Sequence, residues 1–227
     1  MRFRATELSV RLATLAGAGW LALVGSLVGC EANTSGSATS KRHPDPVGPV
    51  PGIVPTHPDH IPPEAHVCAG SPVGDGEATQ QVLAAVADPA APRITVSVPR
   101  DWKSIPGTGD TALMSSGPDT LAATVTIAAT DLTPESAFLR HNAAVGGNMT
   151  RRKFSVTGSP FCGYSSQQLS GTLQGPSGGI DFADRVTHIW TNTKQYLVTI
   201  HLEARSGAPG FNAAKSTWTR DFAVVIP

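Results

Sequence analysis

Apolar and polar residues alternate along several segments of this chain, and this alternation limits the fold more than any other feature. In residues 93–98 and 121–129 every second side chain is apolar. Side chains of a strand point alternately to its two faces, so both segments are predicted to be strands with one buried face. Further strands are expected at 154–156 and 164–173, with short ones at 113–115 and 222–226.

The clearest pair of strands comprises residues 180–190 and 196–202, which are separated by the polar turn 191–195. Two alternating segments joined by a short polar turn predict a β-hairpin. We expect the buried face of this hairpin to combine apolar residues from both strands: Phe182, Val186, Trp190, Tyr196, Val198, Ile200 and Leu202.

Three segments are predicted to be helices. Residues 77–87 place small apolar residues at helical spacing, and residues 211–218 do the same with aromatic ones. Thr133 offers a capping hydroxyl, Pro134 suits the first helical position, and Glu135 suits the first turn. Helices that interrupt adjacent antiparallel strands predict one α+β domain over residues 77–227, with helices packed on the sheet.

The charge of the chain argues against binding to nucleic acid. The sequence holds 17 basic and 17 acidic residues among 227. Without Arg2, Arg4, Arg11 and Glu7 of the N-terminal segment, 14 basic and 16 acidic residues remain, for a net charge of −2. Phosphate backbones are bound by basic surfaces, and a chain with this charge balance shows no sign of one.

The first thirty residues predict export and a lipid anchor. Three arginines precede the uncharged stretch 12–29, which ends in Leu27-Val28-Gly29-Cys30. Small residues before a cysteine at the end of an apolar stretch resemble the bacterial lipobox. The resemblance implies a signal peptide over 1–29, diacylglycerol on Cys30 Sγ, and a chain held at the outer face of the cell membrane. An uncleaved membrane helix is the alternative, and it also places the rest of the chain outside the cytoplasm.

The three cysteines favour one disulfide bond. If Cys30 carries lipid, Cys68 and Cys162 remain, in a compartment where disulfides persist. An even remainder predicts a bridge between them, and two unrelated buried thiols are the alternative.

Residues 30–76 are expected to form a tether that buries no core. Serine and threonine crowd positions 34–40, and eight prolines follow between 44 and 63. Proline-rich segments are extended and semi-rigid. The tether also carries four histidines: His43, His57, His60 and His66. Without fixed carboxylates or thiols beside them a solvated segment is favoured, and a metal site, such as one for zinc, is the alternative.

The order of these features resembles the mycobacterial LpqN-type lipoproteins. The resemblance rests on the lipobox, the Pro/Ser/Thr tether, the Val98-Pro99-Arg100-Asp101-Trp102 turn, the Thr133-Pro134 helix start and the aromatic hairpin. It implies a PsbP-like sandwich, in which a curved antiparallel sheet packs between helices, and a cell-envelope location. It brings no catalytic residues, because the family has no agreed set of them.

The sequence offers one candidate acid–base pair. His188 and Asp184 are four residues apart on one predicted strand, so they share a face. A hydrogen-bonded structural histidine is favoured over catalysis, because no Gly-x-Ser-x-Gly lies at an expected strand-to-helix turn and no HExxH is present. His201 falls on the polar face of its strand and is expected to be solvated. Four aromatic residues are expected in the core, with an apolar ligand site as the alternative: Trp102, Trp190, Tyr196 and Trp218.

These observations favour a non-catalytic lipoprotein that binds a protein partner or an envelope lipid, without cofactor or metal. A structural surface antigen and an envelope hydrolase that uses His188 and Asp184 are the alternatives.

Overall fold

The computed structural model describes residues 48–55, 67–71 and 78–227, and within them the chain forms two antiparallel β-sheets and two helices. The larger sheet has seven strands in the order β4-β5-β6-β10-β9-β8-β7. Its strands are β4 (Lys103–Pro106), β5 (Thr111–Ser116), β6 (Ala122–Thr130), β7 (Thr150–Gly158), β8 (Ser165–Gly175), β9 (Gly178–Trp190) and β10 (Gln195–Arg205).

The smaller sheet has four strands in the order β1-β11-β3-β2. It joins three N-terminal segments to the end of the chain: β1 (Val67–Cys68), β2 (Thr79–Ala84), β3 (Arg93–Pro99) and β11 (Ala223–Val225). Strand β11 therefore lies between β1 and β3, which come more than a hundred residues earlier in the chain.

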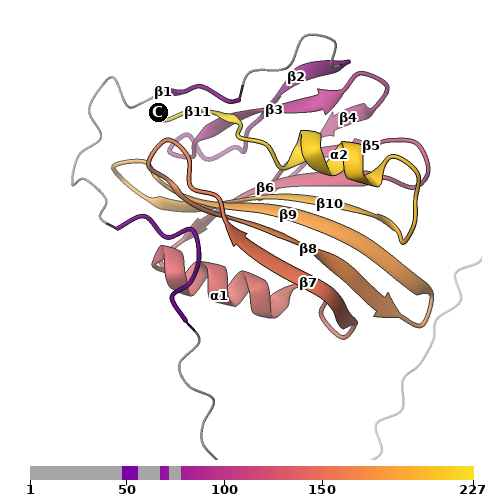
Figure 1. The fold of residues 1–227 in the computed structure, drawn as a ribbon. Coiled ribbons are helices and arrows are strands. Elements are labelled where there is room, and N and C mark those ends of the chain that lie inside the picture. The colour runs from indigo at the N-terminus through magenta and orange to yellow at the C-terminus, as the bar shows by residue number, and fades with distance from the viewer. Residues whose placement is uncertain (1–47, 56–66, 72–77) are drawn as a thin grey trace, which may run out of the picture. The chain divides into compact units, whose positions relative to one another are not determined.

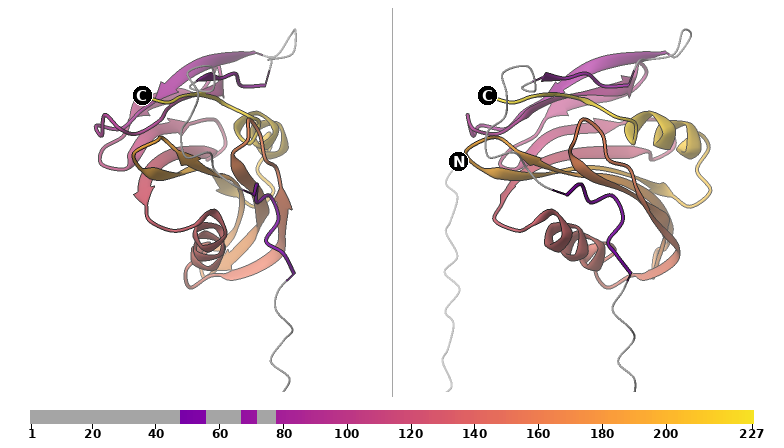
Figure 2. Two further views of the ribbon diagram at one scale, coloured as in Figure 1. Left: turned by 90° about the vertical axis from the view of Figure 1, so that its left-hand side faces the viewer. Right: turned by 60° about the vertical axis from the view of Figure 1, so that its left-hand side comes forward.

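The elements form three layers (Figures 1 and 2). The seven-stranded sheet is the middle layer, with α1 (Pro134–Ala144) on one face. The four-stranded sheet and α2 (Phe211–Trp218) lie together on the opposite face. Each face of the middle sheet therefore borders a separate hydrophobic core.

The larger core lies between the two sheets and α2. Apolar side chains of β3, β6 and β10 meet there with Trp218 of α2, and most of them are fully buried. The smaller core lies under α1, where Phe138 packs against Leu169 and Leu173 of β8 and Phe182 and Val186 of β9. Removing this much apolar surface from water is the main stabilising contribution to such a fold.

Most of the predicted elements are confirmed. Residues 93–98 and 121–129 form β3 and β6, with Ile94, Val96 and Val125 buried as alternation requires. Helix α1 begins as expected, since the hydroxyl of Thr133 accepts a hydrogen bond from the Ser136 amide, and Pro134 is its first residue. The prediction of antiparallel strands with packed helices is therefore correct in outline.

The prediction of a helix over 77–87 is wrong, because residues Thr79–Ala84 form strand β2. This strand pairs with β3 along its whole length, from Thr79 opposite Pro99 to Ala84 opposite Ile94. Only three residues supported the helical pattern, and pairing with a neighbouring strand outweighs so weak a local preference. Within the described residues, the single sheet expected from the sequence is accordingly two sheets, and two helices are present where three were predicted.

The predicted buried face of the β9–β10 hairpin is correct for β10 but wrong for Phe182 and Val186 of β9. The register places Tyr196 opposite Ile189 and Ile200 opposite Arg185, so the apolar residues of β10 face the larger core. Phe182 and Val186 point to the other face, toward α1. Both faces of β9 are buried, and in a strand buried on both sides the alternation does not identify the inner face.

Part of the expected tether packs on the domain. Val50 and Ile53 contact the smaller core, the Gly52 carbonyl accepts a hydrogen bond from the Ser166 amide, and the Pro51 carbonyl accepts one from Gln167. We call residues 48–55 the strap. The expectation that this stretch buries no core is therefore wrong for the strap and for Cys68, which is 5% exposed.

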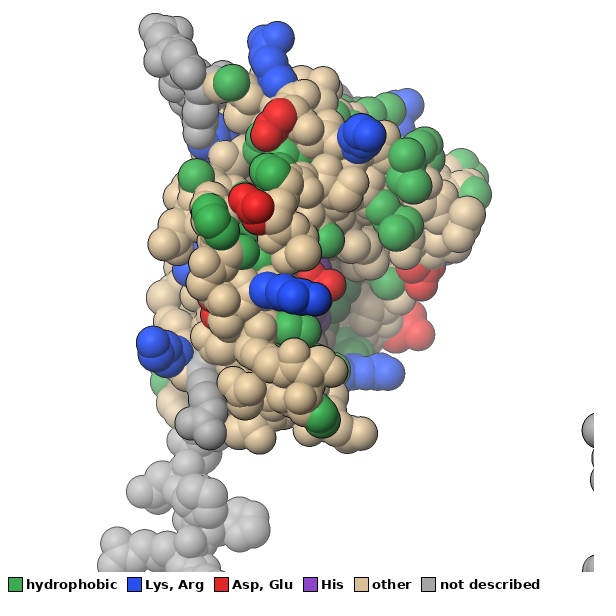
Figure 3. Space-filling view, turned by 90° about the vertical axis from the view of Figure 1, so that its right-hand side faces the viewer, with side chains coloured by type: hydrophobic (Ala, Val, Ile, Leu, Met, Phe, Trp, Pro, Cys, Tyr) green, Lys and Arg blue, Asp and Glu red, His purple; other side chains and the backbone are tan. Residues whose placement is uncertain are grey.

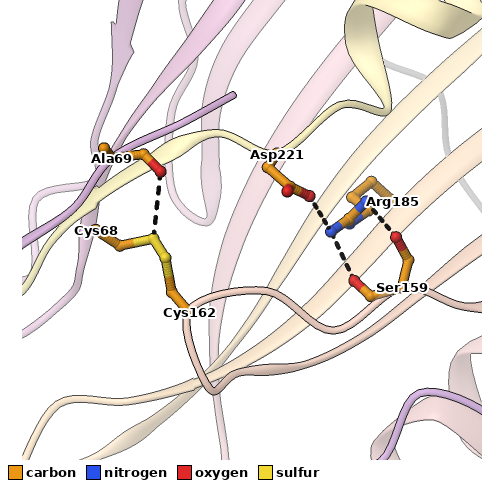
Figure 4. The surroundings of a disulfide bond; sticks show 6 residues. All are labelled: Cys68, Ala69, Ser159, Cys162, Arg185 and Asp221. Carbon is orange, nitrogen blue, oxygen red and sulfur yellow. Dashed lines mark hydrogen bonds and ion pairs between the residues drawn. A yellow bond between two sulfur atoms is a disulfide. The ribbon is translucent and has the colours of Figure 1, made fainter. Parts of the chain in front are cut away.

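The predicted disulfide bond is present between Cys68 and Cys162, which are 94 positions apart with Cα atoms 6.2 Å apart (Figure 4). It joins β1 to the loop that follows β7. Beside it the buried Arg185 side chain donates hydrogen bonds to Ser159 and Ser166, and pairs with Asp221 at 2.7 Å. This buried cation is paired and hydrogen-bonded, as a stable fold requires, and it ties the loop to the C-terminal segment.

No helix within the described residues is long and apolar enough to cross a membrane. The predicted signal peptide and Cys30 lie outside the described residues.

Candidate functional site

A cluster of ionisable side chains lies at the border between α1 and the middle sheet. Asp184 of β9 accepts two hydrogen bonds, from His141 Nε2 of α1 at 2.8 Å and from His201 Nδ1 of β10 at 2.6 Å. His201 Nε2 lies 3.4 Å from Glu203 Oε2. Three elements therefore meet at one carboxylate, which we call the Asp184 cluster.

The fold positions each member of this cluster. His201 lies directly opposite Asp184 in the antiparallel register of β9 and β10. His141 lies one helical turn after Phe138, the residue that fixes α1 on the smaller core. Packing of Phe138 thus directs the His141 ring toward the sheet.

In the Asp184 cluster, the histidines stabilise the charged form of Asp184, and the carboxylates stabilise the charged form of His201. Burial by itself would raise the pKa of Asp184, but hydrogen bonds from His141 and His201 outweigh burial and lower it. Burial likewise opposes the charged form of His201, yet its hydrogen bonds to Asp184 and Glu203 raise its pKa to about 10. At neutral pH the cluster therefore contains an imidazolium between two carboxylates.

The Asp184 cluster differs from the pair predicted from the sequence. Asp184 is in it, but His188 is not, because His188 Nε2 lies 3.0 Å from the Leu132 carbonyl and the ring is completely buried. His201 was expected in solvent, whereas its side chain is only 35% exposed and bonded to Asp184. The missed signals were the strand register and the spacing of His141 from Phe138.

The cluster has limited means for chemistry. The side chains of His141 and His201 are 19% and 35% exposed, so one side of the cluster is open to solvent. Figure 3 shows one face of the molecule, on which a small area of histidine lies recessed beside acidic and basic side chains. Covalent catalysis by serine, threonine or cysteine needs that hydroxyl or thiol within reach of the base. Among the described residues the hydrogen-bond partners of His141 and His201 are carboxylates, with no serine or cysteine among them. The cluster is therefore best suited to holding α1 against the sheet.

No metal centre is formed by the part of the chain that the structure describes: no three of its histidine, cysteine, aspartate or glutamate residues are placed to hold one ion. The tether histidines His43, His57, His60 and His66 lie outside that part.

An open groove of about 560 Å³ lies beside α2. The segments that form it meet at the right-hand side of Figure 1, where β3 ends, α2 begins and the β5–β6 turn approaches them. Its volume is within the range typical of ligand sites. The lining residues are Ala78, Thr79, Pro99, Asp101, Trp102, Pro118, Asp119, Leu121, Pro209, Gly210, Ala213, Ala214, Ser216 and Thr217.

Trp102 takes part in both the core and the groove. It is 5% exposed and belongs to the larger core together with Trp218. The ring centroids of the two tryptophans lie 5.5 Å apart. The ring fits because residue 117 is glycine: Trp102 atoms occupy the space that a Cβ would need there. The prediction that the tryptophans are core residues holds for Trp102 and Trp218, and Trp102 also lines the groove.

Comparison with known proteins identifies a similar fold. No family model and no curated protein matches the sequence. Among solved structures, LpqN, described as involved in cell envelope biogenesis of Mycobacterium tuberculosis, aligns with a TM-score of 0.50 and 17% identity, over 65% of this chain and 91% of that one. A protein of unknown function from Pseudomonas aeruginosa, PA94, aligns with a TM-score of 0.36 and 10% identity, over 62% of this chain and 94% of that one. The chain has an LpqN-like fold, which confirms the resemblance at the level of structure.

Proposed function

We propose that this chain is an exported lipoprotein of the cell envelope, anchored by a lipid on Cys30, whose domain binds a protein partner or an envelope lipid without turnover. The groove beside α2 is the observation that carries the proposal. Its wall is largely apolar, and none of the described residues that line it is a histidine, lysine, arginine or cysteine. A site of this composition provides apolar contact area, and its ionisable groups are the exposed carboxylates of Asp101 and Asp119.

Two observations support the proposed location. The sequence 27–30 resembles a lipobox, and the fold is similar to LpqN, which is described as involved in cell envelope biogenesis. The anchor is tested with Cys30→Ala in the native host, labelled with radioactive palmitate. We expect unprocessed precursor without label, and unchanged labelling would disprove the anchor.

The Asp184 cluster is the observation that favours the alternative of an envelope hydrolase. The mature wild-type chain and His201→Asn are to be assayed with ester, phosphate and glycoside reporters. We expect no turnover by either protein, because no serine, threonine or cysteine is among the described hydrogen-bond partners of the two imidazole rings. Wild-type turnover that vanishes in an equally stable variant would make this protein an enzyme. A structural antigen would show neither turnover nor a partner that depends on the groove.

A further inference from the structure

The groove beside α2 joins an apolar wall to an acidic rim. Trp102, Leu121 and Ala214 contribute buried apolar surface, whereas Asp101 and Asp119 are both exposed. These two aspartates are the ionisable residues among those described in the lining. A ligand that fills the groove therefore meets hydrophobic surface and net negative charge together.

The acidic rim is held by a tight turn. The Gly117 amide donates to the Leu121 carbonyl at 2.8 Å, and the Leu121 amide donates to the Pro118 carbonyl at 3.0 Å. Asp119 and Thr120 both have left-handed backbone conformations, with φ of 52° and 66°. Such conformations are uncommon outside glycine and persist only where surrounding contacts fix them, so Asp119 is held at the rim.

Lysine and arginine side chains match both parts of this groove. Each has an apolar stem that can cover hydrophobic surface while its charged head stays at the edge, in contact with carboxylates. A neutral apolar group would leave the aspartates unpaired, and an anionic group would be repelled by them. The groove is open to solvent, which suits a segment of a protein chain.

Resting on the proposed binding function, we propose that the groove binds a segment of a partner protein that presents a lysine or arginine side chain between apolar residues. The stem of that residue packs on Trp102 and Leu121, and its head lies between Asp101 and Asp119. The preference for a basic residue arises from charge complementarity at the rim, and the groove itself provides the apolar contact.

Three fluorescent heptapeptides test this proposal by anisotropy with the mature chain. They are identical leucine-rich peptides except at the centre, which is arginine, citrulline or glutamate. Citrulline keeps the shape of arginine without its charge. We expect the arginine peptide to bind about tenfold more tightly than the citrulline peptide, as two partly exposed charge contacts imply. The double variant Asp101→Asn/Asp119→Asn should remove that difference, and Asp110→Asn, outside the groove, should retain it.

Ala213→Trp separates this proposal from the proposed function, because its indole fills the groove from α2. Asn212→Trp, on the same helix but outside the lining, is its control. The arginine and citrulline peptides could bind equally well, with Ala213→Trp alone abolishing the binding of both. That result would keep the groove as the binding site but overturn the preference for a basic residue. Peptide binding that survives Ala213→Trp would overturn both. Dodecylammonium, an apolar chain with a cationic head, is tested as a ligand that is not a protein segment. If the arginine peptide does not bind, the proposal of a protein segment is overturned, whether or not dodecylammonium binds.

Discussion

His201 Nδ1 lies 2.6 Å from Asp184 Oδ1, directly across the β9–β10 pair, and the second oxygen of the same carboxylate is bonded to His141 of α1. The carboxylate is 1% exposed. The Asp184 carboxylate therefore connects helix α1 to the middle sheet through one buried charge.

Replacement of Asp184 by asparagine should destabilise the domain by about 2–4 kcal/mol, because charged hydrogen bonds to two histidines are lost at a buried position. Chemical denaturation followed by tryptophan fluorescence measures the change. Asp110→Asn, at an exposed position, is the control and should change the stability by less than about 0.5 kcal/mol. Equal stability of the two variants would contradict the structural role of the cluster.

The contribution of His201 to stability should decline in alkali. Its pKa is raised to about 10 from 6.5, so the charged form favours the folded state. The stabilisation is therefore complete below pH 6.5 and is lost as the pH rises through about 10. The difference in unfolding free energy between the wild type and His201→Asn, measured at pH 6, 8 and 10, should shrink along this series. A difference independent of pH would show that His201 is not charged in the folded protein.

Gly52→Ala should loosen the strap. Gly52 has φ of 79°, and a Cβ at this position would collide with the Ser166 carbonyl. Both effects oppose the substitution, and we expect a loss of about 2 kcal/mol together with faster hydrogen exchange at the Ser166 amide. Gly48→Ala is the matched control, since a Cβ there meets nothing within 4 Å. Equal exchange at Ser166 in both variants would mean that the strap does not dock.

The double variant Cys68→Ala/Cys162→Ala should be less stable than the oxidised wild type by about 3 kcal/mol. The chain-entropy model gives about 4–5 kcal/mol for a loop of this length, and measured values are commonly smaller. Mass spectrometry of the non-reduced protein should show the Cys68 and Cys162 peptides joined. Free alkylation of both thiols in the native protein would refute the bridge.

The sequence predicted those parts of the fold in which local signals agree with tertiary structure. Strands β3 and β6 each bury one face, so alternation identified both strand and inward residues. Strand β9 is buried on both faces, and the sequence could not show which side faces α1. Strand β2 exists because it pairs with β3, and a non-local partner leaves no mark on the segment itself.

The candidate sites were less predictable for the same reason. Asp184 was selected correctly but was assigned a partner on its own strand, His188. Its actual partners come from α1 and β10, and only the β9–β10 register and the docking of α1 bring them together. The groove likewise combines the end of β3, a tight turn and α2, which are far apart in the sequence.

Binding through the groove is tested most directly by photo-crosslinking in envelopes that contain the full-length protein. Four versions are compared: the wild type, Ala213→Trp, Asn212→Trp and Asp184→Asn, the last at a temperature where it stays folded. We predict one crosslinked partner that is lost only in Ala213→Trp, because that substitution alone fills the groove. A partner retained in Ala213→Trp but lost in Asp184→Asn would contradict this, and would place the functional site at the Asp184 cluster.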